Sequence, residues 1–152
     1  MLREKLNDSL KSALKGGDKA QVSTVRLMLS AIKDKDIAAR PKGVTNGIPD
    51  AEILQLLQAM IKQRQDSIKL YQQGGRPELA AAEAAEIKII ESYLPQQMSD
   101  ADMEAAVAAA AAEVKAEGMK GMGRAMALLR ERHAGQMDFG KASALLKAAL
   151  SG

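Results

Sequence analysis

The spacing of the apolar residues is the feature that most restricts how this chain can fold. Leu, Ile, Val, Met and Ala recur every three or four residues along most of the sequence, which is the spacing of one buried helix face. No segment shows the alternation of β-branched and polar residues that is typical of a half-buried strand. The chain has no Trp, one Phe and two Tyr, so its core must be aliphatic, which suits helix packing better than a β-sandwich. We therefore expect an all-α fold.

Glycine, proline and capping residues divide the apolar pattern into seven expected helices. Gly16-Gly17 and Gly74-Gly75 stand where the first and third helices should end, and Asp18 is suited to cap the second. Residues 40–49 contain Pro, Gly and Asn and are expected to form a loop. The expected helices cover residues 2–15, 19–38, 50–73, 77–94, 100–117, 122–134 and 139–150.

Residues 91–100 mark the expected domain boundary. Pro95 disfavours helical geometry at Leu94 and should end the fourth helix there. Ser99 is a good N-cap for the next helix, and Asp100 places negative charge at its positive dipole end. We expect an N-terminal antiparallel helical bundle of residues 1–95, joined by a proline hinge to a small three-helix C-terminal domain of residues 96–152.

The composition excludes several classes of protein. The absence of cysteine excludes a disulfide framework, thiolate metal sites and a cysteine nucleophile, and it is compatible with a reducing cytosol. Residues 1–5 alternate in charge early and lack the apolar segment of a signal peptide. No stretch approaches the roughly 20 apolar residues of a membrane span. The expected location is cytoplasmic, without membrane association.

The search for a catalytic constellation assigns no catalytic residue, metal or cofactor. His133 is the single histidine, which excludes a histidine-rich zinc site, and its place near a helix C-terminus favours a role beside the helix dipole. The sequence contains no Gly-x-Ser-x-Gly elbow, no P-loop and no Gly-x-Gly-x-x-Gly fingerprint. The glycines Gly118, Gly121 and Gly123 follow a helix, whereas a dinucleotide site needs a strand before them.

A first polar cluster lies on the third and fourth expected helices. Arg64 falls within an apolar face, so its guanidinium needs a partner or must reach solvent. Glu83 or Glu86 on the adjacent helix is the expected partner, because buried charges are almost always paired. An acid/base or metal site is the alternative, although two carboxylates without a histidine make a weak ligand set. The candidate structural ion-pair residues are Arg64, Arg76, Glu83 and Glu86.

A second polar cluster lies at residues 119–124. Its glycines free backbone N–H groups at a helix N-terminus, and Lys120 and Arg124 flank them, a combination that can hold a phosphate. A tight inter-helix turn with solvated bases is the alternative. Residues 99–117 carry five acids and one base, whereas residues 118–152 carry six bases and two acids. The candidate RNA-binding residues are Lys120, Gly121, Gly123, Arg124, Arg130, Arg132, Lys141 and Lys147.

Several short motifs in order along the chain carry a family resemblance. They are residues 26–32, Lys62-Gln63-Arg64 with Ser67, Gly75-Arg76 with Leu79, Glu83 with Glu86, Tyr93-Leu94-Pro95, and residues 120–123 with Met126, followed by Leu145, Leu146 and Leu150. With these motifs the chain resembles the YqeY family, which is similar to the tail domain of the GatB subunit of tRNA-dependent amidotransferases. Residues 135–141 depart from the family pattern, which has a more polar approach to the last helix.

The resemblance implies a non-catalytic module that engages tRNA while catalysis takes place in other domains. Two alternatives stay open. One is a protein-interaction or assembly module that uses the alanine-rich fifth helix and Met119, Met122 and Met126. The other is a carbon–nitrogen ligase activity with glutamine as amido-N donor, which the family label implies although no amidase nucleophile or nucleotide site is visible. The expected partners are tRNA or a protein, and the oligomeric state stays open.

Overall fold

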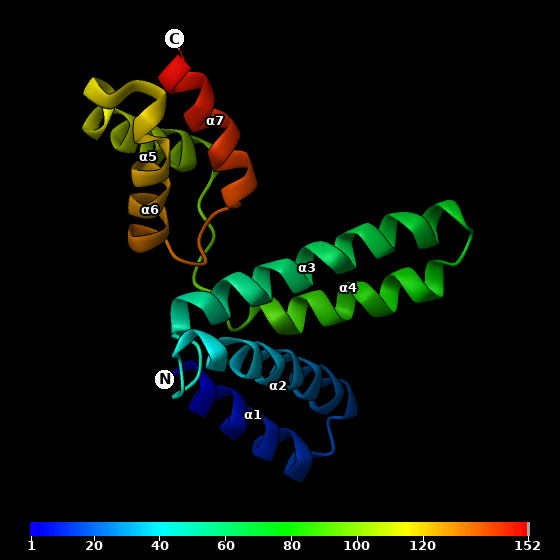
Figure 1. Ribbon diagram of the computed structural model, residues 1–152. Helices are drawn as coiled ribbons and strands as arrows, with labels where there is room; N and C mark the ends of the chain where they lie inside the picture. The colour runs from blue at the N-terminus through cyan, green and yellow to red at the C-terminus, as the bar shows by residue number, and fades with distance from the viewer. Residues whose placement is uncertain (152) are drawn as a thin grey trace. The chain divides into compact units, whose positions relative to one another are not determined.

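A computed structural model describes residues 1–151 of the chain and is helical nearly throughout (Figure 1). The described residues form seven α-helices and two short 3-10 helices and contain no strand, which confirms the all-α prediction. The elements are α1 (Leu2–Gly16), α2 (Lys19–Ala39), η1 (Arg40–Lys42), α3 (Asp50–Gln73), α4 (Pro77–Glu91), α5 (Asp100–Glu113), η2 (Lys115–Gly121), α6 (Met122–Arg132) and α7 (Phe139–Ser151).

The chain divides into two compact units. Unit 1 is Met1–Leu94 and contains α1 to α4, and unit 2 is Pro95–Gly152 and contains α5 to α7. Each unit has its own cluster of buried apolar side chains. No helix within residues 1–151 is both long enough and apolar enough to cross a bilayer.

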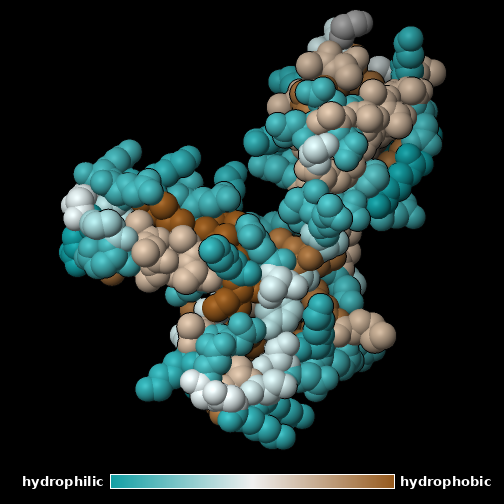
Figure 2. Space-filling model, turned by 180° about the vertical axis from the view of Figure 1, so that it is seen from behind, coloured by the Kyte–Doolittle hydropathy of each residue, from teal (hydrophilic) through white to brown (hydrophobic). Residues whose placement is uncertain are grey.

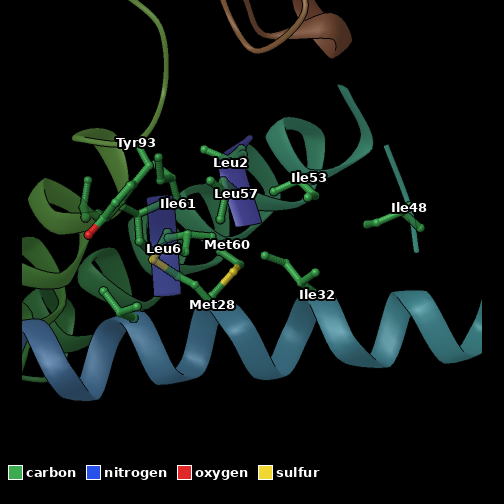
Figure 3. Packing of buried hydrophobic residues seen from close by; sticks show 13 residues of the cluster. Leu2, Leu6, Met28, Ile32, Ile48, Ile53, Leu57, Met60, Ile61 and Tyr93 are labelled. Atoms are coloured by element: carbon green, nitrogen blue, oxygen red, sulfur yellow. The ribbon is translucent and has the colours of Figure 1, made fainter. Parts of the chain in front are cut away.

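Unit 1 consists of two helical hairpins, α1–α2 and α3–α4, which α2 joins by packing against α3 and α4 (Figure 1). Its core is made of large aliphatic side chains from all four helices. Figure 3 shows Leu6, Met28, Ile32 and Leu57 converging on one another between the helices. Because these residues lie far apart in sequence, their burial fixes the arrangement of the two hairpins.

The capping residues act as the sequence predicts. The Asp18 carboxylate accepts a hydrogen bond of 3.1 Å from the backbone N–H of Gln21 at the start of α2. Gly17 ends α1 with a φ of 71°, a left-handed conformation that L side chains rarely adopt. The Ser99 hydroxyl accepts a hydrogen bond of 3.1 Å from the N–H of Asp102 at the start of α5. These local contacts satisfy backbone donors that the helix ends would otherwise leave free.

The loop after α2 is tied to unit 1 by a polar network that the sequence pattern did not indicate. Arg3 donates two hydrogen bonds to the Asp36 carboxylate, at 2.7 and 2.6 Å, and a third of 3.1 Å to the carbonyl of Ile48. Asp36 also accepts a hydrogen bond of 2.8 Å from the N–H of Ile48, whose side chain is buried in the core. The network therefore joins α1, α2 and the segment before α3.

Unit 2 packs α5, α6 and α7 around a core with many small side chains. Ala110, Ala125 and Ala142 are fully buried there, together with Leu129 and Leu146. Small residues at a contact allow helix backbones to approach closely, which explains how an alanine-rich helix finds a partner. Helix α5 ends at Glu113, four residues earlier than expected, because the 3-10 segment η2 (Lys115–Gly121) follows it and carries the chain toward α6.

Two leucines in unit 1 are more exposed than the apolar pattern indicates. Leu27 on α2 is 46% exposed, and Leu14 on α1 is 52% exposed. Leu27 stays outside the core because Val25, Met28 and Ile32 fill the side of α2 that faces it. Figure 2 shows apolar residues, drawn in brown, reaching the surface of unit 1.

Candidate nucleic-acid interface

The six bases of residues 118–152 all have exposed side chains. Lys120 lies on η2, Arg124, Arg130 and Arg132 on α6, and Lys141 and Lys147 on α7. Spacing along each helix spreads them around unit 2, since residues six apart point to different sides of a helix.

Two of these bases are paired with acids of the preceding segment. Arg132 forms a two-pronged ion pair with Glu113, with N–O distances of 2.6 and 2.9 Å. This contact holds the pKa of the Glu113 carboxyl below its ordinary value and raises the pKa of Arg132. Arg124 donates a hydrogen bond to the Glu117 carboxylate. The acidic and basic parts of the last third of the chain thus neutralise each other in part.

Sequence reasoning missed Glu113 and Glu117 as partners of these arginines. The charge separation between residues 99–117 and 118–152 was visible, but the pairing depends on how the end of α5 and η2 lie against α6. Pairs at separations of 19 and 7 residues are set by tertiary packing rather than by helical spacing. No local signal in the sequence could have found them.

The other four bases have no ion-pair partner within residues 1–151. They are Lys120, Arg130, Lys141 and Lys147. The guanidinium of Arg130 lies 6.0 Å from the centre of the Phe139 ring, at the outer limit of a cation–π contact. Exposed and unpaired cations are the groups that phosphates contact most readily.

The glycine-rich segment before α6 has one glycine that packing requires. Gly121 is buried, and a Cβ atom on it would lie 2.7 Å from the Cβ of Val114. Gly123 is exposed, with open space where its side chain would be. Gly121 therefore serves the contact between η2 and the end of α5, and this role is separate from the phosphate-binding role that we expected.

The methionines of this region lie mainly in the core of unit 2. Met126 is buried, Met122 packs against the core cluster, and Met119 is 44% exposed. The methionine-rich surface expected for a protein-interaction module is thus reduced to Met119. His133 follows α6 directly, and its backbone N–H donates a hydrogen bond of 2.9 Å to the carbonyl of Leu129.

The first polar cluster brings Arg64 together with both candidate carboxylates of α4. The Nε of Arg64 lies 2.7 Å from Glu86 Oε2 and 4.0 Å from Glu83 Oε2, and its Nη1 donates a hydrogen bond to the carbonyl of Met60. Arg76 lies elsewhere and pairs with Glu78 at 2.7 Å. No cluster of three or more His, Cys, Asp or Glu side chains able to hold a metal occurs within residues 1–151.

Comparison with known proteins identifies the family of the chain. The family model described as Yqey-like protein matches residues 3–150. The chain belongs to the YqeY-like family. This result confirms the resemblance that the short motifs indicate, and it extends over nearly the whole chain.

Two curated relatives of this YqeY-like chain come from yeasts. The Altered inheritance of mitochondria protein 41, mitochondrial, of Lachancea thermotolerans is 34% identical over 112 residues, which are 72% of this chain and 58% of that protein. The protein of the same name from Vanderwaltozyma polyspora is 35% identical over 89 residues, covering 59% of this chain and 46% of that protein. The chain therefore spans about half the length of the curated relatives that it matches.

These relatives correct the expected cytoplasmic location. All three yeast proteins, including that of Saccharomyces cerevisiae with 34% identity over 91 residues (60% of this chain and 47% of that protein), are named as mitochondrial. The prediction was wrong because it rested on the absence of cysteine and of an apolar leader. Neither feature distinguishes the cytosol from another reducing compartment.

Proposed function

We propose that this YqeY-like protein is a non-catalytic module that binds folded RNA through unit 2, with tRNA as its ligand. The observation that carries the proposal is the set of four exposed bases without an ion-pair partner within residues 1–151, which are Lys120, Arg130, Lys141 and Lys147. Each can contact a phosphate without first breaking an internal ion pair. The resemblance to the tail domain of tRNA-dependent amidotransferases supports the choice of tRNA.

The chemistry of the site favours recognition of RNA shape and backbone. Stacking of unpaired bases needs exposed aromatic rings. Of the three aromatic residues, Tyr93 is buried, Tyr71 is half-buried, and Phe139 is half-buried against the core of unit 2. Spaced cations on a helical surface match the phosphates of a folded RNA instead. The arginines paired with Glu113 and Glu117 contribute less, because an incoming phosphate must compete with a carboxylate.

The test is a fluorescence-anisotropy titration of labelled tRNA with the full chain at several salt concentrations. Saturable binding is expected, and the logarithm of affinity should fall with the logarithm of salt at a slope of about 3, as for roughly four phosphate contacts. Absence of saturable binding at low salt would reject the proposal.

A pair of charge-reversed variants locates the contact. Lys120→Glu with Lys141→Glu should weaken binding at least about tenfold and reduce the salt slope by about 2, because two phosphate contacts are lost. The matched control is Lys62→Glu with Lys69→Glu on α3 of unit 1, which makes the same change in net charge at exposed positions. An equal loss of affinity in the control would show that overall charge, and no surface on unit 2, accounts for binding.

A further inference from the structure

A groove between α1 and α2 of unit 1 takes no part in the proposed RNA contact. It has a volume of about 720 Å³ and follows the exposed side of α2 from Lys19 to Ser30, opposite the face that enters the core. Leu14, Val22 and Leu27 line it, and neither Leu14 nor Leu27 belongs to the core cluster. An exposed apolar patch rimmed by polar residues is a feature of interaction surfaces.

The charges that line the groove indicate which kind of partner it can bind. Lys19 and Arg26 are its charged lining residues, it contains no acid, and neither base has an ion-pair partner within residues 1–151. A second groove on the same hairpin differs, since Glu4, Asp8 and Asp18 line it with Lys5. The two grooves therefore have opposite charge, and the apolar one is the basic one.

The length of the groove fits a short helix. Twelve residues of α2, from Lys19 to Ser30, span about 16 to 18 Å at 1.5 Å per residue, which is about three helical turns. An amphipathic helix of similar length can place apolar side chains at i, i+3 or i+4, and i+7 along such a groove. Carboxylates beside that apolar face would meet Lys19 and Arg26.

We propose that this groove is the docking site for an acidic amphipathic helix of a protein partner. Leu14, Val22 and Leu27 contact the apolar face of that helix, and Lys19 and Arg26 pair with its carboxylates. The site lies in unit 1 and is independent of the RNA-binding proposal for unit 2, so either can fail while the other stands.

The experiment places a photoreactive phenylalanine analogue at position 27 of the full chain, in nuclease-treated extract of the cells that produce the protein. The cross-linked peptide is then sequenced by mass spectrometry. The same analogue at position 70 is the control, because Leu70 on α3 is 67% exposed and lies outside the groove. The expected product is specific to position 27 and is a protein segment with helically spaced apolar residues and acids beside them.

Charge reversal tests the pairing with the basic residues. Lys19→Glu with Arg26→Glu should reduce the cross-link about tenfold or more, while the control Lys62→Glu with Lys69→Glu should leave it unchanged. Circular dichroism of each variant checks that the fold is kept. The proposal is overturned by no product at position 27, by a product with a second copy of this chain or a segment without acids, or by a yield that charge reversal leaves unchanged.

Discussion

Units 1 and 2 are both helical, but they bury different kinds of side chain. The fully buried residues of unit 1 include Leu6, Met28, Ile53, Leu57 and Ile90, whereas those of unit 2 include several alanines beside Leu129 and Leu146. A large side chain buries more apolar area per residue, and a small one allows the helix backbones to approach each other more closely. Helix packing is therefore stabilised mainly by buried apolar area in unit 1 and mainly by close contact between helices in unit 2.

This contrast predicts that opposite kinds of core substitution destabilise the two units. Unit 1 should lose most when a side chain is shortened, and unit 2 should be most sensitive when one is enlarged. The two tyrosines, Tyr71 and Tyr93, both lie in unit 1, so tyrosine fluorescence reports its unfolding, while amide hydrogen exchange of α5 to α7 reports that of unit 2.

The largest effect is expected for Leu57→Ala in unit 1. The side chain has no exposed surface, and its truncation should lower the free energy of unfolding by about 3 to 4 kcal/mol through lost burial and a residual cavity. Urea unfolding followed by tyrosine fluorescence measures the change. Leu70→Ala on the same helix is the control and should change stability little, because that side chain is largely exposed. Equal effects at both positions would contradict the assignment of the core.

The next effect is expected for Gly121→Ala in unit 2. The added Cβ would lie 2.7 Å from the Cβ of Val114, so the contact must open at a cost of about 2 kcal/mol. The φ of Gly121 is −81°, so backbone strain does not contribute. Hydrogen exchange of α5 to α7 measures the loss. Combining it with Val114→Gly, which removes that Cβ, should cost less than the sum of the single changes, and strict additivity would argue against this contact.

Asp36→Asn should have a smaller effect and should also change how stability depends on pH. The Arg3 guanidinium holds the pKa of the Asp36 carboxyl below its ordinary value of 3.8. Because the unfolded chain binds this proton more readily, the contribution of Asp36 is present above about pH 4 and is lost as the pH falls through the folded pKa.

The Asp36→Asn variant should lose about 1.5 kcal/mol near neutral pH, since one charged hydrogen-bond acceptor disappears from a half-buried network. Urea titrations at several pH values measure this. The difference from the wild type should shrink on acidification. A difference that stays constant down to low pH would mean that the Asp36 charge contributes nothing.

The smallest effect is expected for Glu113→Gln in unit 2. The Arg132–Glu113 pair has the same two-pronged geometry as Arg3–Asp36, but its side chains are 44% and 43% exposed, compared with 31% and 19%. Solvent screens an exposed pair, so the change in stability should be small. Thermal unfolding compared with Asp36→Asn measures the contrast. An equal loss from both variants would show that geometry, rather than burial, determines the strength of these pairs.

The helices and their caps could be predicted because the signals are local. The Asp18 and Ser99 side chains each accept a hydrogen bond from a backbone N–H three residues later, so the capping pattern alone is sufficient to place the start of α2 and α5. The end of α5 could not be placed, because the 3-10 segment after Glu113 depends on the fit of Gly121 against Val114.

The sequence predicted which residue types make up the candidate site, but it did not predict which of the bases form ion pairs. The bases from Lys120 to Lys147 were visible from the charge distribution, but which of them stay free depends on the approach of Glu113 and Glu117. Likewise, the sequence did not indicate the groove beside Leu27, because the spacing of an apolar residue in a helix does not show whether it faces the core or solvent.

The sequence by itself determined the helical fold, the positions of most helix ends and the family, because periodicity, capping and short motifs act over a few residues. Tertiary structure alone decided three things. These are the network of Arg3, Asp36 and Ile48, the neutralisation of two arginines in unit 2, and the exposure of Leu14 and Leu27. Each depends on residues that are distant in sequence and that meet only when the helices pack.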